Sequence, residues 1–182
     1  MVSKSYTLKI CGLQRELPVI PITPELSIAS FVILGDTELI CKVAPELIKK
    51  LPPVDIIITA EAKGIPLAFE ISRLLNMNYI IARKSVKPYM YDPLTVEVQS
   101  ITTQKKQILC LDGKDVAAMK GKRVAIIDDV ISTGESIQAI ERLVLQAGGI
   151  IVAKAAILAE GDSGKREDIL YLQGLPVFPT NS

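Results

Sequence analysis

The sequence predicts an α/β fold, in which a twisted parallel β-sheet is flanked by helices. Short, unbroken, β-branched runs such as VDIIIT (54–59) and RVAIID (123–128) are typical of strands that are buried on both faces. These runs alternate along the chain with helical patterns, and that order favours parallel strands joined by right-handed crossovers. A hydrophobic content of 49% agrees, and 182 residues are enough for one domain with a continuous core.

The N-terminal part is expected to lie outside this sheet. Residues 6–20 read as two short extended runs about Gly12, which predicts a hairpin. Asp36 is a good N-cap for a helix that continues to Lys50, with a kink or restart expected at Pro45. Residues 1–35 therefore form a separate N-terminal unit, and the core begins at Asp36.

The core, 36–160, follows in alternating elements, and residues 161–182 form a C-terminal tail. Between the third and fourth core elements, residues 85–108 read as a flap, because LTVEVQSI and QILCL alternate like an exposed antiparallel ribbon. The predicted core elements are strand 54–59, helix 66–75, strand 79–84, strand 123–128, helix 136–147 and strand 150–158.

Charge and composition exclude several classes of function. Lys and Arg (21) nearly balance Asp and Glu (20), so the protein has no long-range field for a polyanion, and no nucleic-acid partner is expected. No apolar run approaches the roughly 18 residues of a membrane span, so we expect no membrane partner. The first residues lack the apolar stretch of a signal peptide, which predicts a cytoplasmic protein.

The sequence contains no histidine, which excludes Ser-His and Cys-His nucleophilic systems and His-ligated metal sites. The cysteines Cys11, Cys41 and Cys110 have no close spacing, which favours thiols over disulfides or zinc.

The segment VAIIDDVISTGES, 124–136, carries the strongest functional signal. A buried strand ends in two carboxylates, Asp128 and Asp129, and a Ser/Thr/Gly turn then opens a helix. Free N–H groups at a helix start bind anions, and Gly134 lets a ligand approach the backbone closely. The acids would repel a phosphate, so we expect them to face hydroxyls or a cation beside it. The alternative is an ordinary strand end followed by an N-cap turn.

This segment resembles the binding motif for 5-phosphoribosyl-1-pyrophosphate (PRPP) in type I phosphoribosyltransferases. EAKGIPLA (61–68) looks like the pyrophosphate loop of that family, ARKSVK (82–87) like a basic segment of its purine enzymes, and GKREDIL (164–170) like the tail of its adenine enzymes. Within the family, the sequence most resembles the adenine enzymes. The resemblance implies the family fold, with an N-terminal hood (1–35) and a flap, and a homodimer. It also implies a role in purine salvage, with PRPP as co-substrate and Mg²⁺ as cofactor.

The resemblance also implies roles for individual residues. The catalytic set is Asp128, Asp129, Arg83, Lys84 and Lys87; the 5-phosphate site is Ser132, Thr133, Gly134, Glu135 and Ser136; the pyrophosphate site is Glu61, Ala62, Lys63 and Gly64. The family often has a non-proline cis peptide in the pyrophosphate loop, here expected at Ala62-Lys63. Mg²⁺ would be held mainly by substrate, and otherwise by Asp128 or Asp129. The basic residues could instead form an ordinary solvated face.

Base recognition is where this sequence departs from the adenine enzymes. Phe31, Val130 and Glu160 are the base-site residues that we predict, and Glu160 leads us to favour adenine over xanthine or hypoxanthine/guanine. The flap sequence differs from the family pattern, which leaves Asp92 and Glu97 as candidates for the proton-transferring acid. A non-catalytic regulator that senses PRPP or nucleotides with the same fold is the alternative from another class.

Overall fold

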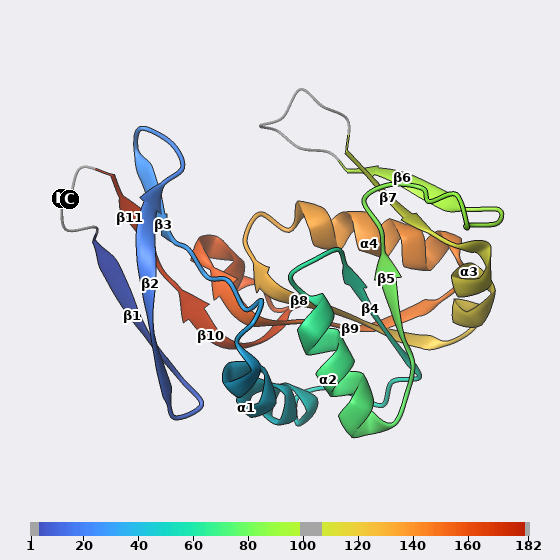
Figure 1. Ribbon diagram of the computed structural model, residues 1–182, viewed down its shortest axis with the longest axis horizontal. Helices are drawn as coiled ribbons and strands as arrows, with labels where there is room; N and C mark the ends of the chain where they lie inside the picture. The colour runs from blue at the N-terminus through green and yellow to red at the C-terminus, as the bar shows by residue number, and fades with distance from the viewer. Residues whose placement is uncertain (1–3, 99–106, 181–182) are drawn as a thin grey trace.

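The computed structural model describes residues 4–98 and 107–180. Its centre is a five-stranded parallel sheet of order β10-β9-β8-β4-β5, which confirms the predicted fold class (Figure 1). The strands of this sheet are β4 (Ile56–Ala60), β5 (Tyr79–Ala82), β8 (Arg123–Ile131), β9 (Ile150–Glu160) and β10 (Leu170–Leu175).

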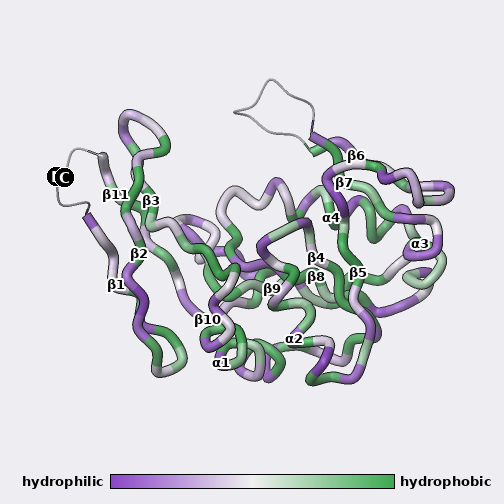
Figure 2. Tube along the Cα trace, viewed as in Figure 1, coloured by the Kyte–Doolittle hydropathy of each residue, from purple (hydrophilic) through white to green (hydrophobic). Residues whose placement is uncertain are grey.

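Helices cover both faces of the sheet, and neighbouring strand residues divide between two cores. Ile57 and Ile127 pack with α1 (Thr37–Ile48) and α2 (Ile65–Leu75). Ile58 and Ile126 pack on the other face with α4 (Glu135–Gln146). This two-sided burial explains the unbroken apolar runs, which stand out in the central strands in Figure 2. A short helix that the sequence did not predict, α3 (Gly113–Met119), precedes β8.

The hood is a second, antiparallel sheet of order β1-β2-β3-β11. Its strands are β1 (Ser5–Ile10), β2 (Leu13–Pro21), β3 (Leu26–Ala29) and β11 (Val177–Pro179). The predicted hairpin is present, with Cys11 and Gly12 both at positive φ in its turn. Neither β3 nor β11 was predicted: Val177 of the tail pairs with Ile28 of β3, so the tail completes the hood.

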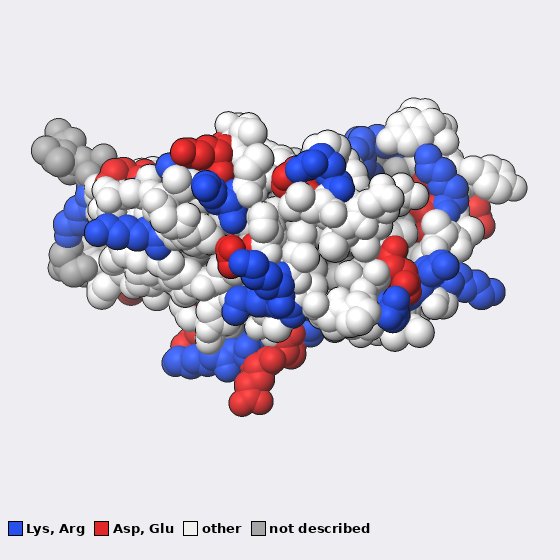
Figure 3. Space-filling view, turned by 90° about the horizontal axis from the view of Figure 1, so that it is seen from below, with Lys and Arg blue, Asp and Glu red and all other residues white. Residues whose placement is uncertain are grey.

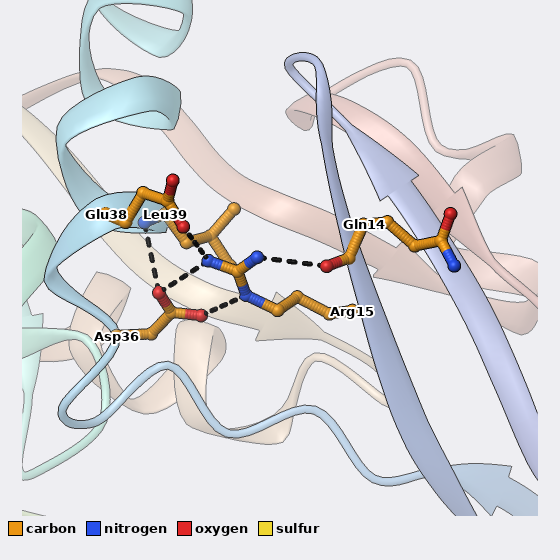
Figure 4. Close-up of polar contacts among 5 residues, drawn as sticks. All are labelled: Gln14, Arg15, Asp36, Glu38 and Leu39. Carbon is orange, nitrogen blue, oxygen red and sulfur yellow. Dashed lines mark hydrogen bonds and ion pairs between the residues drawn. The ribbon is translucent and has the colours of Figure 1, made fainter.

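A polar contact ties the hood to the core (Figure 4). The Arg15 guanidinium of β2 donates to Asp36 at 2.7 Å and to Glu38 at 2.8 Å. Asp36 also accepts the Leu39 N–H, which confirms it as the N-cap of α1. The helix continues through Pro45 without the restart that the sequence suggested.

The flap consists of β6 (Leu94–Val98) and β7 (Gln107–Leu111), an antiparallel pair as predicted. It packs on the core through Val96 and Leu109, which are buried with α4 residues. Arg142 of α4 also donates to the Glu97 carbonyl, and Arg83 pairs with Cys110. The predicted turn of the flap, 103–106, lies outside the described residues.

The surface agrees with the balanced charge, since acidic and basic side chains are interspersed on the face shown in Figure 3. Of the helices in the described ranges, none is long and apolar enough to cross a membrane.

Candidate active site

Two adjoining clefts lie where the parallel strands β4 and β8 end. The larger has a volume of about 220 Å³ and the smaller about 50 Å³, and Asp128, Val130 and Ser136 line both. Ligands in open α/β sheets gather at this carboxyl edge. The further lining of the larger cleft is Ala60, Glu61, Ala62, Lys63, Lys84, Val98, Gln107, Ile108, Leu109 and Asp129.

The smaller cleft is built by the turn from β8 into α4. It is lined by all five residues predicted to hold the 5-phosphate, Ser132 to Ser136. Gly134 is the N-cap of α4 at φ +86°, a backbone conformation that glycine adopts without strain. No side chain caps this helix, so its first N–H groups are available to a ligand. A water needs roughly 10 to 15 Å³ of such space, so this cleft has room for a group the size of a phosphate.

The two predicted acids both line the larger cleft, and Asp128 also lines the smaller one. Strand β8 runs to Ile131, beyond its predicted end at Asp128, so both acids lie within the strand near its carboxyl end. The Asp129 N–H donates to Asp128 Oδ1 at 2.9 Å. Burial, and then the charge of Asp129, raise the pKa of Asp128 above its ordinary value.

Asp129 has an unused hydrogen-bonding atom. Its side chain is only 5% exposed, and its Oδ2 has no hydrogen-bond partner in the described part of the chain. The nearest cation is the Lys63 ammonium, 3.6 Å away. Buried polar atoms are nearly always paired, so this oxygen is suited to receive a hydroxyl or a cation from a ligand.

The predicted pyrophosphate loop forms the opposite wall of the larger cleft. It connects β4 to α2, and Ala62 and Lys63 face the cleft. The Glu61 carboxylate accepts the Lys84 N–H at 3.0 Å, a bond that lowers the pKa of Glu61, and the nearby cation of Arg83 lowers it further. The cis peptide bond is Glu61-Ala62, so the expectation of Ala62-Lys63 was wrong by one residue.

The predicted cations separate in the structure. Lys84 lines the larger cleft, whereas Arg83 lines a different surface pocket, with Tyr89 and Asp112. Arg83 still lies 3.9 Å from Glu61. Lys87 donates to Ser85 Oγ and lines neither cleft.

The predicted base-site residues also separate. Val130 lines both clefts. Phe31 is 5% exposed and packs in the hydrophobic core, and no described residue of 1–35 lines either cleft. Glu160 ends β9, outside the lining of both; burial raises its pKa, and the charge of Lys63 opposes that shift.

The flap contributes residues that the sequence did not assign to the site. Val98, Gln107, Ile108 and Leu109 line the larger cleft, whereas neither Asp92 nor Glu97 does. The alternating pattern predicted the ribbon, but only its placement on the core shows which residues reach the cleft.

Comparisons with known proteins agree with this geometry. A family model for the phosphoribosyl transferase domain matches residues 37–178. A hypoxanthine/guanine phosphoribosyltransferase of Methanococcus voltae is 36% identical over 136 residues, which cover 74% of this chain and 69% of that protein. A xanthine phosphoribosyltransferase of Chloroflexus aurantiacus is 31% identical over 145 residues, 79% of this chain and 67% of that protein.

Solved structures show the same fold. An adenine phosphoribosyltransferase of Thermoanaerobacter pseudethanolicus has a TM-score of 0.71 at 22% identity, covering 87% of this chain and 95% of that one. The adenine phosphoribosyltransferase of Rhodothermus marinus has a TM-score of 0.64 at 22% identity and covers 94% of each chain. Because the family model spans most of the chain and includes both clefts, this protein belongs to the phosphoribosyl transferase domain family.

Proposed function

We propose that the protein transfers the 5-phosphoribosyl group of PRPP to N9 of a purine base. The bond from N9 to ribose C1 forms, the C1–O bond to pyrophosphate breaks, and the N9 proton is lost. The observation that carries this proposal is the junction of the two clefts at Asp128: a turn that opens a helix without a side-chain cap lies on one side, and a second loop with a cation lies on the other. A sugar with a phosphate at each end fits such a pair of clefts.

Each part of the site has a role in this proposal. The turn 132–136 holds the 5-phosphate through backbone N–H groups and hydroxyls. Asp128 and Asp129 accept hydrogen bonds from the ribose hydroxyls. The backbone of Ala62 and Lys63, with the side chains of Lys63 and Lys84, stabilises the charge that builds up on pyrophosphate as the C1–O bond breaks. Gly64, also predicted for this site, does not line the cleft. The flap excludes water, which would otherwise capture the cationic ribose.

Mg²⁺ fits this site as a partner of the substrate. The described residues contain no group of three or more acidic or cysteine side chains that could hold a metal ion alone. They do offer Asp128 and the unpaired Oδ2 of Asp129. We therefore propose that substrate oxygens hold most of the ion, with Asp128 or Asp129 beside it. The bound ion would neutralise charge on the leaving pyrophosphate.

The identity of the base rests on two opposing observations. The relatives above 30% identity act on hypoxanthine, guanine or xanthine, and they favour a 6-oxopurine. Glu160 is the residue through which the sequence favours adenine, because a carboxylate accepts a hydrogen bond from an exocyclic amine, but it lies outside the lining of both clefts. We place the 6-oxopurines first and keep adenine, the base expected from the sequence, as the second candidate.

One assay tests both the proposed transfer reaction and the identity of the base. The protein is incubated with PRPP, Mg²⁺ and adenine, hypoxanthine, guanine or xanthine in turn, and pyrophosphate release is measured. Release with one of the four identifies the base, and Glu160→Gln should weaken use of adenine selectively if that base is the substrate. PRPP binding without release for any base would favour the regulator over the enzyme.

The predicted homodimer and cytoplasmic location also remain proposals. Phe69 and Leu74 of α2 are large apolar side chains, 52% and 42% exposed, and a second copy of the chain could cover them. Sedimentation of the purified protein measures the oligomeric state directly.

A further inference from the structure

The proposed phosphate turn lacks a positive charge of its own. The segment from Asp128 to Ser136 contains the acids Asp128, Asp129 and Glu135, and no Lys or Arg. A phosphate bound there would meet backbone N–H groups but also an acidic neighbourhood. A cation from another part of the chain would offset that repulsion.

Arg166, between β9 and β10, lies directly against this turn. A Cβ placed on Gly134 would be 2.6 Å from Arg166 Nη1 and 3.9 Å from its Cζ. The guanidinium thus occupies the space that a side chain at position 134 would need. Gly134 is buried although Ser132 and Thr133 beside it are exposed.

A carboxylate holds this guanidinium in a fixed orientation. Arg166 Nε and Nη2 donate to the two oxygens of Asp168, at 3.0 and 2.8 Å. Asp168 also accepts from Lys154 Nζ at 2.5 Å, and Lys154 donates to Glu141 of α4 at 2.6 Å. The fork therefore uses Nε and Nη2, and within the described residues Nη1 has no acceptor.

We propose that Arg166 binds the phosphate held by the turn 132–136: it lies against Gly134 but outside the residues that line the smaller cleft, and its Nη1 donates to the 5-phosphate while Asp168 orients the guanidinium. The ligand is a sugar 5-phosphate, and its identity as PRPP or its product rests on the proposed function. Arginine in a fixed fork suits this task, because it is always charged and its donors match phosphate oxygens. Glycine at 134 is required twice, for its positive φ and for the space that Arg166 fills.

The test compares two arginines that sit in the same kind of fork. Arg123 donates through Nε and Nη2 to Asp55 at 3.0 and 2.7 Å, but at the other end of β8. Arg166→Gln and Arg123→Gln thus each break one bidentate ion pair. Binding of ribose 5-phosphate and of ribose is measured by calorimetry for wild type and both variants.

We expect Arg166→Gln to weaken ribose 5-phosphate binding by at least about tenfold, since charge-assisted bonds to phosphate are strong. Arg123→Gln should bind like wild type, and ribose should bind all three proteins equally weakly. Arg166→Lys keeps the charge without the fork and should fall between wild type and Arg166→Gln. If Arg166→Gln does not fold, the affinity of Arg166→Lys for ribose 5-phosphate tests the proposal in its place.

The outcomes separate this inference from the proposed function. Arg166-dependent binding of ribose 5-phosphate by a protein that transfers no purine supports the inference while the enzyme proposal fails. Equal affinity of wild type, Arg166→Gln and Arg123→Gln overturns the inference, even if wild type is an active transferase. No binding of ribose 5-phosphate to wild type also overturns it.

Discussion

Gly64, in the loop from β4 to α2, offers a sharp test of the packing beneath the proposed pyrophosphate site. Its φ is −70°, so an alanine there would adopt the same backbone without strain. The obstacle is steric: a Cβ would lie 2.1 Å from Thr59 Oγ1 and 3.3 Å from Asp128 Oδ1. We predict that Gly64→Ala destabilises the protein through its contact with Thr59.

The size of the effect follows from how tightly Thr59 is held. Thr59 is fully buried in β4, between β5 and β8, so its hydroxyl cannot move into solvent. Adding a methyl group to such a packed site typically costs about 1 to 3 kcal/mol. For a chain of this length, each kcal/mol lowers the melting temperature by about 2 to 4 °C.

Thr59→Ala is the second substitution of a double-mutant cycle with Gly64→Ala. It removes the clashing oxygen, which has no hydrogen-bond partner in the described ranges, and one methyl group. Losing the methyl costs about 1 kcal/mol, and removing an unpaired buried hydroxyl offsets that loss by a similar amount. The double variant should therefore be more stable than Gly64→Ala alone, with a coupling energy of at least about 1 kcal/mol.

Urea unfolding of wild type, both single variants and the double variant measures this coupling. Gly174→Ala is the control, because its Cβ would meet only the Ala159 carbonyl at 3.9 Å and should change little. If the two substitutions add within about 0.5 kcal/mol, the contact between Gly64 and Thr59 does not exist as described.

Three further predictions concern the acids and the phosphate turn. Asp128→Asn combined with Asp129→Asn should leave the circular dichroism spectrum unchanged but lower turnover at least about a hundredfold, because each lost charge-assisted bond to ribose costs about 1.5 to 3 kcal/mol; wild-type turnover would reject the assignment. Asp128→Asn alone should change how the free energy of unfolding depends on pH. The pKa of Asp128 is raised in the folded state, so protonated Asp128 stabilises the fold, and this contribution is lost as pH rises from 3.8 through the folded pKa. Urea unfolding across that range should therefore show a smaller decline in stability with pH for the variant than for wild type. PRPP with Mg²⁺ should raise the melting temperature of wild type, with a stabilisation of about 2.7 kcal/mol at 100 times the dissociation constant, and a free purine should stabilise it much less. Gly134→Val should abolish the response to PRPP; a normal response of the variant would place the phosphate elsewhere.

The sequence predicted four strands of the central sheet, β4, β5, β8 and β9, because their residues are buried on both faces and their apolar runs are unbroken; it did not predict β10, which lies in the segment read as a tail. The strands it missed have no such signal. β11 is only Val177–Pro179, and its pairing with β3 depends on a contact between the two ends of the chain. A short segment of mixed polarity does not reveal a partner so distant in sequence.

At the candidate site, the sequence likewise did not predict which individual side chains line the clefts. Arg83 and Lys84 are adjacent in a motif that predicts a common role, yet only Lys84 lines the larger cleft. The reason is the extended backbone, since Arg83 continues from β5 and pairs with Cys110 of the flap. Successive side chains of extended chain point to opposite sides, and here Arg83 lines the separate pocket that contains Tyr89 and Asp112. Phe31, predicted to contact the base, lies instead in the hydrophobic core, where it packs with apolar neighbours.

The position of Arg166 follows from the topology of the sheet more than from its local sequence. Strands β9 and β10 are parallel neighbours, so the chain that leaves β9 at the carboxyl edge must fold back before β10 begins opposite Ala155. Residues 161–169 make that return, and they start at the edge where β8 delivers Asp128 and the turn 132–136. Ser163 fastens the segment there, since its hydroxyl donates to the Ile131 and Glu160 carbonyls at 2.6 and 2.8 Å. Arg166, three residues later, is thereby held against Gly134. The tail reaches the proposed phosphate site because the chain has to pass this edge of the sheet before β10 can pair in parallel with β9.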